Sequence, residues 1–347
     1  MISRVTVIIL NWNGWQDTIE CLESLYQISY SNYNVIVLDN SSSDDSIEKI
    51  RDYCRGKLSP ESDFFEYTSS NKPIEIVEYT EKEIENETSE NKFHDFQPNK
   101  RLILIKNSEN HGFTEGNNIG IRYVLKNLNS DYILLLNNDT VVDECFLNEL
   151  VKVAENDPKI GFVGPKVYYY NYNGRKNVIN FAGGKQNLWK FKPSHIGYKE
   201  IDKGQYDTNQ EVDYIHGCCL LARVQMIRDV GLLDKEYVSY REENDWAIRG
   251  YNCGWKSVYA YKSKMWHKIG GSTNRNTNLF VDYLETKNRF LFVKKYSNNW
   301  QTLSFLLYFF IFDFWLISAI DLIYFKNLKR YKSFLKAIKD GIKILRT

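Results

Sequence analysis

One pattern recurs four times in this sequence: a short apolar run, rich in β-branched residues, that stops abruptly at polar residues. The runs cover residues 5–10, 35–38, 102–105 and 132–136. Each has the length and composition of a strand that is buried on both faces, and amphipathic segments separate them. Such alternation is typical of an α/β fold with a mostly parallel central sheet flanked by helices. We therefore expect ligands to bind at the carboxyl ends of these strands.

Two stretches depart from this alternation. Residues 56–99 are rich in Glu, Ser, Asn and Lys, so we expect an acidic insertion that forms a solvated hairpin or a partly ordered loop rather than a binding element. Residues 161–272 contain more Gly, Tyr and Trp, and we expect them to complete the same domain. Between the strands, helices are predicted over 17–26, around 47–50 and over 117–128.

The bulk composition excludes several classes of protein. The 347 residues carry 45 Lys and Arg against 44 Asp and Glu, so no global field attracts nucleic acid, and none is expected as a partner. The six cysteines lack the C-x-x-C spacing of a zinc site and the density of a disulfide scaffold, so we interpret them as reduced. The first apolar run is too short for a signal peptide, which predicts a cytoplasmic catalytic part.

Polar clusters follow three of the predicted strands. They are Asn11-Trp12-Asn13, Asp39-Asn40 and Asn137-Asn138-Asp139. A carboxylate at such a position can accept a hydrogen bond from a nucleobase or bind a hard cation, and a neighbouring aromatic ring can stack on the base. Each cluster alone is equally typical of turn chemistry, because Asn and Asp favour turns. In a parallel sheet, however, the three clusters meet at one edge.

Together with later motifs, these clusters resemble the family 2 glycosyltransferases with the GT-A fold. The later motifs are Asn110-His-Gly-Phe113, Gly116-Asn-Asn-Ile-Gly120, Gly231-Leu-Leu-Asp234, Tyr240-Arg-Glu-Glu-Asn-Asp245 and Trp266-His267. The resemblance covers roughly the first 290 residues apart from the insertion, and within the family it is nearest to rhamnosyltransferase-like and galactofuranosyltransferase-like enzymes. It implies a catalytic domain over 1–290 and a separate C-terminal region over 291–347.

The resemblance implies a metal site. Asn137-Asn138-Asp139 stands at the D-x-D position, where the last carboxylate holds a divalent cation on the donor diphosphate, and His267 matches a downstream histidine ligand. Asp139 is thus the implied ligand, while Asn137 departs from the usual Asp. Oxygen ligands and phosphates suit Mg²⁺ or Mn²⁺, and an imidazole favours Mn²⁺. Without the motifs, His267 would be interpreted as a packed core residue.

The resemblance also implies a nucleotide-sugar site. Asp39 stands where the family accepts a hydrogen bond from a pyrimidine ring, with Asn11 and Trp12 lining the base and ribose. Asn117 falls in the segment that closes over the ribose and sugar, although this segment could equally be a helix start without ligand contact. A pyrimidine nucleotide carrier, UDP or dTDP, is implied.

The acidic cluster Glu242-Glu243-Asn244-Asp245 is the catalytic candidate. Carboxylates this close raise the pKa of one of them, as a general base requires, but an exposed acidic helix N-terminus would look the same. In the family the second carboxylate of the pair is the base, which implies Glu243 here, where Asp is more usual. Glu242 and Asp245 are then expected to orient the loop or contact the acceptor. The implied reaction is a single displacement that inverts the anomeric carbon.

Residues 303–325 are almost wholly apolar and precede a Lys-rich tail. The segment is long enough to span a bilayer, yet it contains Asp313 and Asp321. We favour a helix that lies in the membrane interface over a true span or an internal packing helix. Such a membrane-associated extension would place the enzyme at the cytoplasmic face of the membrane, beside lipid-linked acceptors.

Other functions fit the sequence less well. A nucleotidyltransferase would need a basic, Gly-rich phosphate loop near the first strand, and Asn11-Trp12-Asn13-Gly14 contains no Lys or Arg. A processive polysaccharide synthase would carry a Q-x-x-R-W motif and several spans. The alternative that stays open is a non-catalytic nucleotide-sugar- or membrane-binding protein of the same fold. We expect instead an enzyme of cell-surface polysaccharide or glycoprotein glycan synthesis, with rhamnose as one candidate sugar.

Overall fold

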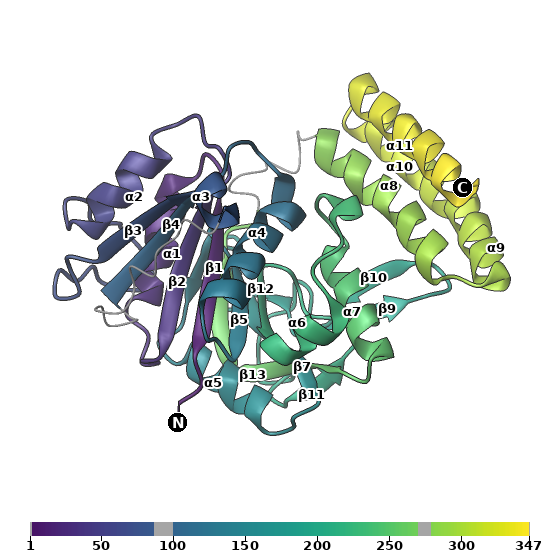
Figure 1. Ribbon diagram of the computed structural model, residues 1–347. Coiled ribbons are helices and arrows are strands. Elements are labelled where there is room, and N and C mark those ends of the chain that lie inside the picture. Colours follow the sequence, from purple (N-terminus) through teal and green to yellow (C-terminus); the bar gives the residue numbers. More distant parts are fainter. Residues whose placement is uncertain (1, 87–99, 270–278, 347) are drawn as a thin grey trace.

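The computed structural model describes residues 2–86, 100–269 and 279–346 (Figure 1). Its N-terminal half alternates strands and helices, as the sequence predicts. The elements are β1 (Val5–Asn11), α1 (Trp15–Leu25), β2 (Tyr33–Asp39), α2 (Ser46–Cys54), β3 (Glu75–Thr80), α3 (Glu81–Glu85), β4 (Arg101–Lys106), α4 (Gly112–Asn127) and β5 (Tyr132–Asn137). The strands pair in parallel in the order β5-β1-β2-β4-β3. Helix α4 begins five residues before the predicted start.

The expectation that the acidic insertion forms a hairpin or loop is wrong for residues 75–85, which form a strand and a short helix. Its residues 75–80 form β3, a parallel edge strand on β4, and α3 follows directly behind a capping box between Thr80 and Glu83. The strand tolerates its acidic residues because it lies at the sheet edge, where Arg51 and Lys106 pair with Glu78 at 2.6 and 3.0 Å. Residues 87–99 lie outside the described part of the chain.

The second half of the chain extends the same sheet. Its elements are β6 (Thr140–Val142), α5 (Phe146–Glu155), β7 (Ile160–Tyr169), β8 (Ile179–Phe181), β9 (Gly184–Asn187), β10 (Lys192–His195), β11 (Gln210–Val212), β12 (Cys219–Arg223), α6 (Val224–Val230), α7 (Glu242–Asn252) and β13 (Lys256–His267). Strand β12 runs antiparallel between β5 and β7, so the sheet continues as β12-β7-β13-β11. Residues 161–267 therefore complete the domain, as expected.

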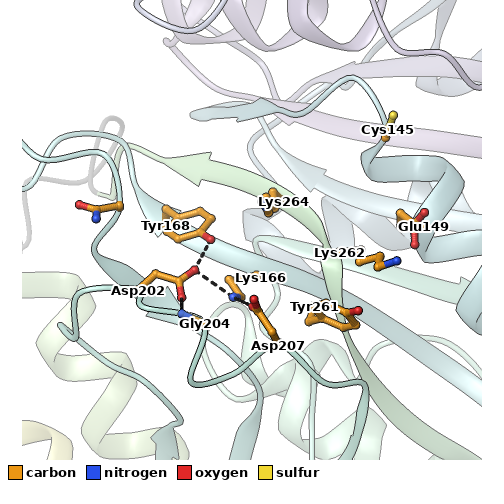
Figure 2. Close-up of a pocket in the computed structure, with 11 residues that line it drawn as sticks. Cys145, Glu149, Lys166, Tyr168, Asp202, Gly204, Asp207, Tyr261, Lys262 and Lys264 are labelled. Carbon is orange, nitrogen blue, oxygen red and sulfur yellow. Dashed lines mark hydrogen bonds and ion pairs between the residues drawn. The ribbon is translucent and has the colours of Figure 1, made fainter.

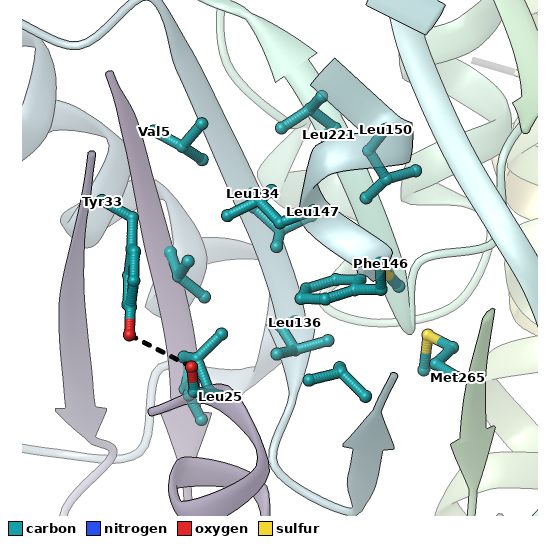
Figure 3. Packing of buried hydrophobic residues seen from close by; sticks show 14 of the residues in the cluster. Val5, Leu25, Tyr33, Leu134, Leu136, Phe146, Leu147, Leu150, Leu221 and Met265 are labelled. Atoms are coloured by element: carbon teal, nitrogen blue, oxygen red, sulfur yellow. Dashed lines mark hydrogen bonds between the residues drawn. The ribbon is translucent and has the colours of Figure 1, made fainter. Parts of the chain in front are cut away.

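Both faces of the sheet are covered, because alternate residues of each buried strand are apolar on opposite sides. On one face, Val7 and Val35 pack with α1, α2 and α5, and on the other, Ile8 and Ile36 pack with α4, α6 and α7. Figure 3 shows the first of these cores, where Phe146, Leu147 and Leu150 of α5 meet the leucines of β5. This core fixes where the strands end.

The C-terminal helices form a group beside the sheet domain (Figure 1). They are α8 (Leu279–Tyr296), α9 (Asn299–Tyr308), α10 (Phe314–Ala319) and α11 (Leu328–Arg346). An aromatic core of Phe290, Phe305, Phe309 and Phe334 joins α8, α9 and α11. The predicted domain boundary at residue 290 falls inside α8, and the described part of the helical group starts at Leu279.

The predicted apolar segment lies within one long helix. Helices α9 and α10 and two π-helical turns, Phe309–Asp313 and Ile320–Tyr324, make a continuous helix over residues 299–324. Both acidic residues turn inward: Asp313 pairs with Arg289 at 2.5 Å, and Asp321 pairs with Arg330 at 2.7 Å. The two carboxylates are an obstacle to placing this segment in apolar surroundings. Both are therefore neutralised by arginines inside the helical group.

Candidate active site

The ends of β1, β2 and β5 meet at one edge of the sheet, as the strand pattern predicts. In the parallel register, Asn11 lies opposite Asp39, and Leu10 lies opposite Asn137. A cavity of about 750 Å³ opens at this edge, and Trp12 lines it beside the residues that follow β5. The three polar clusters therefore belong to one site.

The predicted nucleotide-binding residues are bonded to one another. Asp39 Oδ1 accepts hydrogen bonds from Asn11 Nδ2 at 2.8 Å and Ser42 Oγ at 2.6 Å, and its Oδ2 accepts one from the Ser42 backbone N–H at 3.0 Å. Asn11 and Asp39 are buried, while Trp12 is 43% exposed at the cavity wall. The ring of Trp12 can therefore contact a ligand directly. The buried Asn11 and Asp39 join the ends of β1 and β2 next to it.

Asn137, Asn138 and Asp139 all line the cavity, but they differ in their partners. Asn138 Nδ2 donates to Thr18 Oγ1 at 3.0 Å, which ties this turn to α1. Asp139 Oδ1 lies 3.0 Å from His267 Nε2, and both side chains are almost fully buried. The antiparallel pairing of β6 with β13 sets His267 opposite Thr140 and so brings the two residues together across 128 positions of sequence.

The donor set of Asp139 and His267 fits a divalent cation. The two side chains are hydrogen-bonded to each other at 3.0 Å, and a carboxylate oxygen and an imidazole nitrogen are both atoms that Mn²⁺ accepts as ligands. Among the residues that the structure describes, no group of three or more His, Cys, Asp or Glu side chains is arranged to hold a metal. Among the described residues, Asp139 and His267 are thus the pair that would hold an ion here, and a bound ligand or water would contribute further oxygen atoms.

Asn117 does not reach the cavity wall. Its side chain is buried within α4, and its Nδ2 donates to the Phe113 carbonyl oxygen at 2.8 Å, one helical turn earlier. Of the two interpretations of this segment, the geometry matches a helix residue without ligand contact. Phe113 itself lines the cavity.

The acidic cluster lies on a second wall of the same cavity, at the N-terminus of α7. Glu242 and Glu243 both line the cavity, and burial raises the pKa of each carboxyl above its ordinary value. For Glu242 the neighbouring charge of Glu243 adds to this effect, whereas for Glu243 the guanidinium of Arg241 opposes it. Burial also lowers the pKa of Arg241 to about 10. A raised pKa at a cavity wall is what a general base at this position requires.

Asp245 faces away from the cavity. Its carboxylate accepts hydrogen bonds from Arg249 Nε at 2.7 Å and Tyr296 Oη at 2.6 Å, and it is fully buried. These contacts join α7 to α8. Asp245 is therefore placed to hold the acidic segment in position, and Glu242 and Glu243 are the carboxylates that face the cavity.

The sequence motifs missed several residues that complete the cavity. Val281, Leu284 and Glu285 of α8 line the wall next to Glu243. His195 and His216 line it as well, with ring centroids 4.9 Å apart, and His216 lies 6.2 Å from the ring of His267. The helical spacing of the three α8 residues was a readable signal, but no motif marked this helix as part of a site.

A smaller pocket of about 430 Å³ lies away from the strand ends, between β7, β13 and the loop around Asp202 (Figure 2). The buried Lys166 pairs with Asp202 at 2.9 Å and with Asp207 at 2.6 Å, and Tyr168 also donates to Asp202. These contacts tie the loop around Asp202 to β7, so this pocket has the character of a structural anchor for the loop.

The sequence matches two family descriptions and several curated proteins. Residues 73–289 match "Glycosyltransferase like family 2", and residues 6–71 match "Glycosyl transferase family 2". A low-salt glycan biosynthesis hexosyltransferase, Agl10 of Haloferax volcanii, is 24% identical over 55% of this chain and 59% of its own length. An N-acetylglucosaminyl-diphospho-decaprenol L-rhamnosyltransferase of Mycobacterium tuberculosis is 24% identical over 42% of this chain and 50% of its length. The chain thus spans between half and three fifths of these relatives.

Solved structures share the fold at low sequence identity. The mannosyltransferase PcManGT from Pyrobaculum calidifontis, in complex with GDP-Man and Mn²⁺, has a TM-score of 0.54 and 12% identity, covering 98% of this chain and 76% of its own. GalNAc-T7 with UDP, GalNAc and Mn²⁺ has a TM-score of 0.54 and 13% identity, covering 91% and 58%. TarS of S. aureus has a TM-score of 0.53 and 12% identity, covering 99% and 49%.

Proposed function

Because the chain belongs to the family 2 glycosyltransferases and has the GT-A fold, we propose that it transfers a sugar from a nucleotide diphosphate donor to a hydroxyl group of a glycan or lipid-linked glycan. One observation carries the proposal: the Asp139 and His267 pair and the half-buried Glu243 line the same cavity. This arrangement gives a place for a diphosphate and a base that faces it. A non-catalytic binding protein would have no need of a buried carboxylate at a raised pKa.

We assign the role of general base to Glu243. Its carboxylate takes the proton from the acceptor hydroxyl as that oxygen bonds to the anomeric carbon, and the bond from this carbon to the diphosphate oxygen breaks. The single displacement inverts the anomeric configuration. A divalent cation, Mn²⁺ or Mg²⁺, held by Asp139 and His267 would supply positive charge near the departing diphosphate. Trp12 stacks on the base, and Asp39, which Asn11 holds by a hydrogen bond, accepts a hydrogen bond from the pyrimidine ring.

The chemistry of the relatives supports a more specific donor and acceptor. One relative is described as a hexosyltransferase of glycan biosynthesis and another as an L-rhamnosyltransferase acting on a diphospho-decaprenol carrier. We propose a UDP- or dTDP-linked hexose or rhamnose as donor and a lipid-linked glycan as acceptor. Production of cell-surface polysaccharide or glycoprotein glycan would follow from that acceptor.

Release of nucleoside diphosphate from a panel of UDP-, dTDP- and GDP-sugars tests this function. We expect turnover with a UDP- or dTDP-sugar that stops with EDTA and returns with Mn²⁺. Lys262→Ala, in the smaller pocket, is the matched control and should keep wild-type turnover. Chelator-insensitive turnover would contradict the metal site, and the absence of turnover with all donors and lipid-linked acceptors would contradict the enzyme.

We also propose that the C-terminal helical group rests on a membrane surface. Within the described residues, one helix, Asn299–Tyr324, is long and apolar enough to cross a bilayer, with a mean hydropathy of 2.1 over its most apolar part. Its exposed side chains are mostly large and apolar, and they include Leu303, Leu307, Phe310, Ile311, Phe312, Trp315, Leu316, Ile320, Leu322 and Ile323. The inner side carries Asp313 and Asp321, whose ion pairs hold it against α8 and α11.

These contacts favour a helix that lies in the interface over one that spans. A span would have to leave its two arginine partners or take the Lys-rich α11 into the bilayer, and buried charges without partners are costly there. The exposed lysines of α11 suit anionic headgroups; they are Lys329, Lys332, Lys336, Lys339 and Lys343. That the protein binds the cytoplasmic face of this membrane stays a prediction.

Sedimentation of the full chain with vesicles of mixed zwitterionic and anionic lipids tests the membrane proposal. We expect binding that Phe312→Glu with Trp315→Glu abolishes, while Tyr251→Glu, at an exposed aromatic residue of α7, leaves it intact. Alkaline carbonate should release the protein from native membranes. Resistance to carbonate would contradict the interfacial placement and favour a span.

A further inference from the structure

The loop that leads into the acidic cluster has an unusual backbone. Val238, Tyr240 and Arg241 have positive φ angles of 59°, 69° and 76°. Positive φ is unfavourable for residues with a Cβ and is an outlier for a β-branched residue such as Val. Such a segment persists only where its surroundings hold it, and strain of this kind gathers at functional sites. The question is which contacts hold it.

The loop's carbonyl groups are bonded from outside the loop. The Val238 oxygen accepts a hydrogen bond from the Thr114 backbone N–H at 2.9 Å, at the start of α4. The oxygens of Tyr237, Ser239 and Tyr240 accept hydrogen bonds from one atom, Asn288 Nδ2, at 2.8, 2.8 and 3.0 Å. A single side chain of α8 therefore reaches three of four successive carbonyls.

Asn288 is itself held in place. It is fully buried, and it lies on the same face of α8 as the cavity residues Val281, Leu284 and Glu285, which precede it by seven, four and three positions. The next residue, Arg289, anchors the helix by donating to the Phe191 and Lys190 carbonyl oxygens at 3.1 and 2.6 Å. The donor atom that holds the loop thus belongs to a fixed helix.

We propose that Asn288 is a positioning residue for Glu243, which sets the strained loop so that the carboxylate faces the cavity. The inference rests on the proposed function, because it takes Glu243 as the base. Asn288 touches neither donor nor acceptor in this account. It holds the carbonyl group of Tyr240, and Tyr240 and Arg241 lead directly into Glu242 and Glu243 at the start of α7. Removing its amide lets the loop relax to ordinary φ values and moves the base from its place.

The test is the effect of Asn288→Ala on turnover and on nucleotide binding. With the nucleotide sugar that the wild type uses fastest, kcat should fall roughly 10- to 100-fold, the usual cost of misplacing a catalytic group by about 1 Å. Binding of UDP with Mn²⁺ should stay within about twofold, because its residues lie on the other wall. Asn288→Ser keeps one donor and should lose less of kcat. If the alanine variant fails to fold, the kcat of Asn288→Ser is the measurement that tests the proposal.

Asn34→Ala is the matched control. Asn34 is also a buried asparagine, bonded to Arg101 at 2.6 Å, but it stands near the start of β2, at the end of the strand away from Asp39. It should lower the melting temperature comparably and leave kcat unchanged. Full turnover in both Asn288 variants while Glu243→Gln is inactive would overturn the positioning role alone. Full turnover in Glu243→Gln would instead overturn the base on which it rests.

Discussion

On one wall of the large cavity, polar side chains at the ends of β1, β2 and β5 have hydrogen-bond partners: Asn11 bonds Asp39, Asn138 bonds Thr18, and Asp139 bonds His267. On the other, Glu242 and Glu243 each keep a buried carboxylate oxygen that has no hydrogen-bond partner among the described residues. We call the first the strand-end wall, comprising Asn11, Trp12, Asp39 and residues 137–139. The second is the loop wall, comprising residues 238–244. The strand-end wall follows from regular structure, and the loop wall exists against local preference.

The difference between the two walls shows which residues stabilise the fold and which are held in place at a cost in stability. Polar groups on the strand-end wall stabilise the fold as well as forming a binding surface, since each satisfies another. On the loop wall, buried carboxylates and positive φ angles cost stability, and contacts from α8 and α4 hold them. A substitution on the strand-end wall should therefore lower stability, whereas removal of a charge from the loop wall should lower activity and raise stability.

The largest effect is expected at the base. Glu243→Gln should lower kcat by about 10²–10⁴-fold, the usual worth of general-base help, because the amide cannot accept the acceptor's proton. The rate of nucleoside diphosphate release measures this. Glu48→Gln, at the exposed first turn of α2, is the control and should keep the wild-type rate. A Glu243→Gln enzyme with the wild-type rate would remove the loop wall from the mechanism.

A smaller effect is expected on the strand-end wall. Asp39→Ala removes the acceptor of three hydrogen bonds from Asn11 and Ser42, so unfolding by urea should show a loss of about 1–3 kcal/mol. The affinity for UDP should fall in the same variant, since the proposed acceptor for the pyrimidine ring is lost. An unchanged free energy of unfolding would mean that this network adds nothing to the fold.

The smallest effect has the opposite sign. Burial raises the pKa of Glu243, with Glu285 adding to the effect and Arg241 opposing it, so its ionised form costs stability at neutral pH. Glu243→Gln should therefore be more stable than wild type at pH 7, by about 0.5–2 kcal/mol. The difference should shrink as the pH falls and the wild-type carboxyl takes up its proton. Thermal unfolding between pH 4 and 8 measures this, and a destabilised variant at pH 7 would contradict it.

The strand-end wall could be predicted from sequence because its geometry is local. Each apolar run sets where a strand stops, and a parallel register then brings Asn11, Asp39 and Asn137 to one edge. The family and the GT-A fold, predicted from motifs, are confirmed. The role of Asn117 was not fixed by its motif, because the same residues also fit a helix position whose side chain bonds within α4.

The loop wall could not be predicted to the same depth. Its motif marked Glu242 and Glu243, but the residues that hold them come from α8, which carries no motif and lies some 40 positions later in the chain. Asn288 and Glu285 contribute through packing between helices, which composition does not reveal. The same holds for Asp313 and Asp321, whose arginine partners could not be identified without the fold.

The most direct test of the two-wall account is calorimetric titration of UDP, with and without Mn²⁺, into Asp139→Asn and Glu243→Gln. We predict that Glu243→Gln, though inactive, binds UDP with the wild-type dependence on Mn²⁺. Asp139→Asn should lose that dependence, with an affinity that Mn²⁺ no longer raises. If Mn²⁺ still strengthens UDP binding to Asp139→Asn as in the wild type, or if Glu243→Gln loses the effect, the division of roles between the two walls is wrong.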